Sequence, residues 1–252
     1  MDTGIYSHLT DILLGQEFSD NGISNEHFEV AKIAALQQSR SENAITVVSN
    51  LHSNSSFIVY GRLGRFLGVS VEKEGEEVPS IWEDNLLERV HPDDIVEKLA
   101  LELQFITFVK SLPADERQDY YLQHVLRMKN AEGEYIYLIH RIFYLQYDDC
   151  GNVMLALCLY TIAGEEQPIV GIINSLRGKI ENETAAEVSV ILSNREKEVL
   201  RLIGKGNASK EIAEKLSIST HTVNVHRQNI IKKMHVNNST EAYNVARRLG
   251  LI

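Results

Sequence analysis

Residues 193–252 of the 252-residue chain contain a series of helix starts and stops that only a small helical domain can accommodate. Ser193 and Glu196 have the spacing of a capping box, in which each side chain bonds the backbone amide of the other residue, so a helix begins there. Gly204 and Gly206 end this helix, because glycine readily adopts the positive backbone angle of a C-cap. A second helix of two turns follows, with apolar residues between 212 and 216.

A third, longer helix is expected after residues 217–218, because the Ser219 hydroxyl can accept a hydrogen bond from an amide of the first turn. A short helix, a tight turn and a longer helix together predict a helix-turn-helix. At about 100° per residue, one face of the third helix is apolar. His226 lies on that face, so we expect it to be a packed structural histidine rather than a ligand. The apolar residues of the face are Val223, Ile230, Ile231 and Met234.

The opposite face of the third helix combines amides, one small apolar group and cations. Asn and Gln present a donor and an acceptor side by side, which matches N6 and N7 of adenine, and a small aliphatic group can contact a thymine methyl. We therefore expect this face to read bases, while hydroxyl and cationic side chains around it hold phosphates. The expected base-reading residues are His221, Asn224, Val225 and Gln228, and the expected phosphate-binding residues are Lys210, Thr220, Arg227 and Lys232.

An ordinary solvated helix face has a similar pattern, and the distribution of charge favours the DNA-binding interpretation. Residues 193–252 contain 11 Lys and Arg and 5 Glu, a net charge of +6. The whole chain has a net charge of −10, which leaves −16 for residues 1–192. A basic module on an acidic body is what phosphate binding by one end of a chain requires.

These motifs, in this order and spacing, resemble the LuxR/NarL-type DNA-binding domain. The motifs are Leu192 to Leu200, Lys210 to Ala213, Ile218-Ser219, Thr222 to His226, and the closing segment Glu241 to Ile252. The resemblance implies a four-helix domain that dimerises through its last helix, roughly 239–249, with Tyr243, Asn244 and Arg247 exposed. Three positions depart from the family pattern and bear on the operator sequence rather than the fold. Asn224 replaces a lysine, Ala208 replaces the capping serine of the second helix, and Ser239 stands where arginine is frequent.

The length of the chain predicts two domains, with the remaining residues before 193 forming the first. We expect flanking or dimerising helices in residues 1–43, a sensory domain in 44–168, a linker that can include one more hairpin in 169–192, and the DNA-binding domain in 193–252. No N-terminal segment combines a basic region with an apolar run, and the longest apolar run is shorter than the roughly 20 residues of a membrane span. The protein is therefore expected to be cytoplasmic.

The sensory domain is expected to be α+β, with a five-stranded antiparallel sheet and helices on one face. A β-rich hairpin, two helices and three further strands follow one another, and their turns contain Gly with Asn or Asp. This order, with His91-Pro-Asp-Asp94 before a helix, resembles a PAS domain. The expected strands are 44–49, 56–60, 121–128, 134–147 and 152–162, and the expected helices are 80–90 and one from Asp93 or Asp94, as N-cap, to about 110.

The sequence does not single out any chemical site in this domain. His91, Asp93 and Asp94 are best interpreted as a helix start, because a helix N-terminus favours acidic residues. Cys150 and Cys158 are expected to be free thiols, since their spacing fits neither a metal nor a redox pair. No metal site is expected, and neither a cofactor nor ligand-binding residues can be assigned. Five aromatics, expected in the core or around a ligand cavity, are Tyr135, Tyr137, Phe143, Tyr144 and Tyr147.

Three functions remain open at this point. The first is a sequence-specific transcription regulator whose PAS-like domain senses a small molecule or a partner. The second keeps DNA binding but makes the PAS-like domain a ligand-free platform for dimerisation or protein interaction. The third, an enzyme, is the weakest, because no convergent set of titratable groups can be assembled. In the first two, a homodimer binds double-stranded DNA through two recognition helices in successive major grooves. Its half-sites are then expected about 10 bp apart or at a related spacing, in a roughly palindromic operator.

Overall fold

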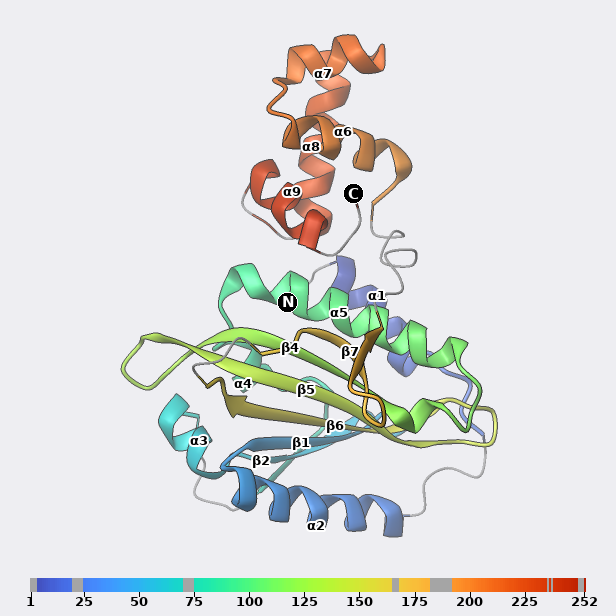
Figure 1. The fold of residues 1–252 in the computed structure, drawn as a ribbon, viewed down its shortest axis with the longest axis vertical. Helices are drawn as coiled ribbons and strands as arrows, with labels where there is room; N and C mark the ends of the chain where they lie inside the picture. The colour runs from blue at the N-terminus through green and yellow to red at the C-terminus, as the bar shows by residue number, and fades with distance from the viewer. Residues whose placement is uncertain are drawn as a thin grey trace. The chain divides into compact units, whose positions relative to one another are not determined.

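The computed structural model of the protein describes residues 4–19, 25–69, 75–164, 168–181, 192–234, 236, 238–248 and 252. Its described N-terminal part is built on an eight-stranded antiparallel sheet with the order β3-β2-β1-β6-β5-β4-β7-β8 (Figure 1). The strands are β1 Ile45–Asn50, β2 Ser55–Val59, β3 Glu76–Val78, β4 Tyr120–Lys129, β5 Tyr135–Tyr147, β6 Val153–Ile162, β7 Gly171–Asn174 and β8 Lys179–Glu181. The helices are α1 Gly4–Leu14, α2 Asn25–Glu42, α3 Gly61–Leu67, α4 Asp84–Leu87 and α5 Pro92–Ser111, with a short 3₁₀ helix Arg117–Asp119.

The five predicted strands are present and lie side by side at the centre of the sheet, as β2, β1, β6, β5 and β4. The prediction of a five-stranded sheet is nevertheless wrong in number, because three short edge strands extend it. Strand β3 pairs with β2 within a segment expected to be an acidic loop, and β7 and β8 form the additional hairpin expected after residue 168. Backbone pairing decides these edges, since three or four residues carry too little side-chain periodicity to identify a strand.

The central hairpin β4–β5 follows from alternation in its sequence. Every second residue of β4 from Leu122 to Met128 is buried, and the same holds for β5 from Leu138 to Tyr144. At the turn between them, Gly133 has φ of 88°, and the Asn130 side chain accepts a hydrogen bond from the Glu134 amide at 2.8 Å. The predicted Gly and Asn turn chemistry therefore closes this hairpin.

Two helical predictions need correction. Residues 80–90 were expected to form one helix, but only the four residues of α4 are helical. Helix α5 was expected to be capped by Asp93 or Asp94, whereas its N-cap is His91, whose Nδ1 accepts a hydrogen bond from the Asp93 amide at 3.2 Å. Asp94 instead binds the guanidinium of Arg127 on β4, at 2.6 Å and 3.0 Å. Because the Asp94 carboxylate binds Arg127, it does not cap α5.

Side chains from both faces of the sheet are buried. Along one face, helix α2 packs on β1 and β6 through Ala35, Val48 and Leu155 (Figure 1). The other face contributes a second cluster, which includes residues of α3 and α4. This cluster contains Ile45, Val47, Ile58, Tyr60, Leu63, Leu67, Leu86, Val90, Leu126, Met128, Leu138 and Tyr160. Within the described residues, none of the helices has both the length and the apolar character of a membrane span.

The described residues of the C-terminal part form four helices and no strands, in agreement with the predicted four-helix domain. Its helices are α6 Asn194–Gly204, α7 Ser209–Leu216, α8 Thr220–Met234 and α9 Ser239–Arg248. Helices α6, α7 and α9 all pack against α8. Residues 182–191 of the expected linker lie outside the described residues, as does Leu249 at the expected end of the last helix.

Candidate nucleic-acid interface

Helix α6 begins with the predicted capping box. The Glu196 amide donates to Ser193 Oγ at 3.3 Å, and the Ser193 amide donates to Glu196 Oε2 at 2.7 Å. The same carboxylate oxygen accepts a hydrogen bond from Lys233 Nζ of α8 at 2.7 Å. Burial by itself would raise the pKa of Glu196, but the bonds from Lys233 and Ser193 outweigh burial and hold that pKa below its ordinary value. The cap therefore also connects α6 to α8.

Helices α7 and α8 form the predicted helix-turn-helix. Ala208 has no capping side chain, yet the Glu211 carboxylate accepts a hydrogen bond from the Ala208 amide at 2.7 Å and supplies half of a capping box. Ser217 closes α7 in the left-handed region with φ of 53°. Ser219 Oγ accepts from the Thr222 amide at 3.0 Å, which confirms Ser219 as the cap of α8.

The two faces of α8 are divided as predicted. Val223, Ile230 and Met234 are buried, and Ile231 and His226 are partly buried. The expected base-reading residues are all exposed: His221, Asn224, Val225 and Gln228. Val225 stands out, because it is an apolar side chain that is 39% exposed between two amides. A small exposed aliphatic group is of the kind that can contact a thymine methyl.

The expected phosphate-binding residues differ in their surroundings. Lys210, Thr220 and Lys232 are exposed, and Thr220 opens α8, where backbone amides point outward. Arg227 is only partly exposed, because its guanidinium donates to Ser209 Oγ of α7 at 3.0 Å and to Ser239 Oγ of α9 at 2.7 Å. This side chain therefore joins three helices of the domain, a structural role that its sequence position did not indicate.

The residues expected to be exposed on α9 also differ from one another. Asn244 and Arg247 are exposed. Tyr243 is half-buried, and its ring lies so close to Gly204 of α6 that a Cβ atom at Gly204 would overlap it. Tyr243, expected to be exposed, is thus only partly so, since the missing side chain of Gly204 provides the space that the ring occupies.

The five aromatic residues expected in the core or around a cavity differ in burial. Tyr144 is buried, whereas Tyr135 and Tyr137 are 41% and 60% exposed. Phe143 stacks on Tyr121 of the neighbouring strand, with ring centroids 5.1 Å apart. Burial raises the pKa of the Tyr147 hydroxyl well above its ordinary value.

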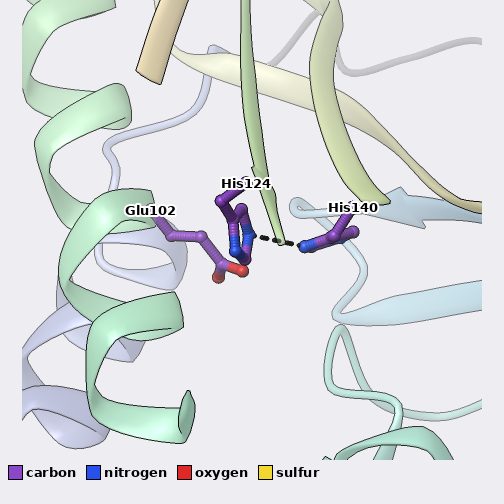
Figure 2. Close-up of side chains that lie close together, drawn as sticks. All are labelled: Glu102, His124 and His140. Carbon is purple, nitrogen blue, oxygen red and sulfur yellow. Dashed lines mark hydrogen bonds between the residues drawn. The ribbon is translucent and has the colours of Figure 1, made fainter. Parts of the chain in front are cut away.

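One polar pair in the core was missed from the sequence. His124 and His140 are buried at cross-strand positions of β4 and β5, and His140 Nδ1 lies 2.8 Å from His124 Nε2 (Figure 2). The signal was available in the alternation of the strands, because both histidines occupy positions where the residues two before and two after are buried and apolar. A buried polar side chain in such a row is the informative exception.

The C-terminal part matches a known family. Residues 190–246 match the family model of bacterial regulatory proteins of the luxR family. The response regulatory protein YgeK of Escherichia coli K12, described as uncharacterized, is 47% identical over 60 residues, which cover 24% of this chain and 41% of that protein. The oxygen regulatory protein NreC of Staphylococcus aureus is 33% identical over 141 residues, 52% of this chain and 58% of that protein.

The chain thus spans about half the length of the curated relatives it matches. Among solved structures, a complex of phage VqmA with DPO aligns over 88% of this chain and 91% of that one, with 15% identity and a TM-score of 0.28. A TM-score this low supports no conclusion about fold or function. The residues that match the family, 190–246, by contrast include α6, α7, α8 and most of α9. The C-terminal part of the chain is a helix-turn-helix domain of the luxR family.

Proposed function

We propose that the protein is a transcription regulator that binds specific double-stranded DNA as a homodimer. The observation that carries this proposal is the exposed face of α8, where Asn224, Val225 and Gln228 stand side by side with no partner in the described residues. Their two amides and one aliphatic group match the adenine and thymine edges of the major groove. The net charge of +6 in residues 193–252 supports attraction to phosphates.

In this mechanism α8 enters the major groove, with its N-terminal half against the bases. Asn224, Val225 and Gln228 read base edges, and His221 lies at the margin of the contact. Lys210, Thr220 and Lys232 hold phosphates on either side and fix the register of the helix. Arg227 can contribute to phosphate binding only from its position between Ser209 and Ser239. Asn244 and Arg247 of α9, with Tyr243 partly buried beside them, form the dimer contact.

The test compares two exposed residues of α8 in the full chain, on DNA obtained by in vitro selection. Gln228→Ala should cost about 1–3 kcal/mol on the selected site and relax the preference at one base position. Lys232→Ala should weaken binding to selected and random DNA by the same factor. It should also reduce the slope of log affinity against log salt concentration by about one, the value for one phosphate contact. Equal losses on selected and random DNA for Gln228→Ala would remove the base-reading assignment.

For the N-terminal domain we propose a PAS-like sensor of a small molecule or a partner. The five central antiparallel strands and the start of α5 at His91 agree with that resemblance. Native mass spectrometry of the chain purified from its own host, first under gentle and then under denaturing conditions, tests the proposal. A mass excess that is lost on unfolding supports a sensor. An unliganded dimer supports the alternative, a ligand-free platform for dimerisation or protein interaction.

A further inference from the structure

A row of aromatic and imidazole rings crosses the core of the N-terminal sheet. His124 on β4 pairs directly with His140 on β5, which pairs with Tyr160 on β6. All three side chains are buried, at 2%, 0% and 1% exposure. The rings of His140 and Tyr160 are stacked, with centroids 4.2 Å apart and planes 12° apart. The Tyr160 ring therefore fixes the orientation of the His140 imidazole.

A buried ion pair on α5 belongs to the same neighbourhood. Asp94, Lys98 and Glu102 succeed one another at intervals of four residues, so they share one face of the helix. Asp94 binds Arg127 of β4, and this directs the face toward β4. Lys98 Nζ donates a hydrogen bond to Glu102 Oε1, and both side chains are buried. Figure 2 shows His124 between the Glu102 carboxylate and His140.

The donor atoms of these residues suit a metal ion. Glu102, His124 and His140 each offer one ligand atom, and the three atoms lie within 4.8 Å of one another. Two imidazoles and one carboxylate are a ligand set that zinc and other first-row divalent ions accept. Two nitrogens bound to one tetrahedral ion at about 2.0–2.1 Å lie roughly 3.4 Å apart. The present separation is 2.8 Å, so the rings would move apart by roughly half an ångström.

We propose that Glu102, His124 and His140 bind a divalent first-row transition-metal ion, which enters between the two imidazole nitrogens that now lie 2.8 Å apart. Lys98 opposes this binding. Its ammonium pairs with the Glu102 carboxylate, and a divalent ion at the same carboxylate would add positive charge to the core. The metal must therefore displace Lys98 from Glu102, which makes Lys98 a competitor for the site. The proposal concerns the N-terminal domain and holds whether or not the C-terminal domain binds DNA.

The test uses the full chain without a polyhistidine tag, stripped with a chelator and titrated with Zn²⁺ against a chromophoric competitor. One Zn²⁺ per chain is expected, and Co²⁺ should give the visible absorption of a four-coordinate site. Glu102→Gln and His140→Gln should abolish this stoichiometric binding. Lys98→Met should tighten it on the order of tenfold, the lower end of what outer-shell changes produce. His27→Ala, which removes an exposed histidine, is the matched control and should bind like the wild type.

A measurement on the wild type keeps the proposal testable if a core variant fails to fold. Side-chain ¹⁵N NMR of the histidines should show Zn²⁺ shifting the ring nitrogens of His124 and His140 and no others. The proposal is overturned by absence of stoichiometric binding, by Zn²⁺ shifts confined to exposed histidines, or by unchanged Zn²⁺ binding in a folded His140→Gln variant. Weaker Zn²⁺ binding by Lys98→Met would also contradict it, since a competitor cannot assist the ion it excludes.

Discussion

At the scale of single residues, Glu196 connects local and tertiary structure in the DNA-binding domain. Its carboxylate caps α6 through the Ser193 amide and also binds Lys233 of α8. The side chain is only 3% exposed, so the ion pair is shielded from solvent on the carboxylate side. Removing the charge of Glu196 should therefore affect the packing of the recognition helix as well as the start of α6.

We predict that Glu196→Gln lowers the stability of the C-terminal domain by about 1 kcal/mol at neutral pH, because the amide can still cap but cannot pair with Lys233. The pKa of Glu196 is lowered in the folded state, so its contribution is present above the unfolded pKa and lost as the pH falls through the folded one. Hydrogen exchange of α6 and α8 amides in the full chain, at several pH values, measures the stability difference between variant and wild type. The difference between variant and wild type should shrink in acid, and a constant difference would exclude the ion pair as its cause.

At the scale of elements, Arg227 of α8 joins this helix to α7 and α9. Its two hydrogen bonds reach the start of α7 at Ser209 and the start of α9 at Ser239, which is buried. Hydrogen bonds to charged groups contribute about 1.5–3 kcal/mol each, and a buried hydroxyl that loses its partner is costly. An effect of Arg227 on DNA binding therefore has a structural as well as an electrostatic origin.

We predict that Arg227→Met reduces hydrogen-exchange protection at the starts of α7 and α9 and weakens DNA binding. Lys232→Ala is the control, since this exposed residue should alter DNA affinity with unchanged protection. If Arg227→Met left protection unchanged and still weakened DNA binding, direct phosphate contact would account for the whole effect.

The contact between α6 and α9 depends on the absence of a side chain at Gly204. We predict that Gly204→Ala destabilises the C-terminal domain by about 1–3 kcal/mol, because the added methyl overlaps the Tyr243 ring. Thermal unfolding of the full chain, followed by the helical signal, measures the loss. Adding Tyr243→Ala to Gly204→Ala should recover part of it, and a double variant no better than Gly204→Ala would show that the ring is not the obstacle.

At the scale of the whole molecule, the proposed homodimer makes a prediction about DNA geometry. Two recognition helices related by a two-fold axis meet successive major grooves, so the half-sites should be inverted and about 10 bp apart. Inserting about 5 bp between them turns one half-site to the opposite side of the duplex and should reduce affinity to that of a single half-site. Fluorescence anisotropy with spacer variants of the DNA measures the affinity. An affinity independent of spacing would indicate that the DNA-binding domains of the two protomers bind separately.

The sequence by itself determined the helical domain, because its signals are local. A capping box, a left-handed turn and the spacing of apolar residues act within a few residues, and they predicted α6 to α8 and the exposed face of α8. The long central strands were predictable for the same reason, since β-rich runs separated by turns with Gly and Asn or Asp identify strands locally.

Only the tertiary structure decided the remaining features, because they depend on partners far apart in the chain. Asp94 could cap α5 or bind a residue of the sheet, and it binds Arg127 of β4. The edge strands required a neighbour to pair with, and the half-burial of Tyr243 required Gly204. Likewise, His124 and His140 are ordinary histidines 16 residues apart in sequence, and only the register of β4 against β5 brings their nitrogens together in the core.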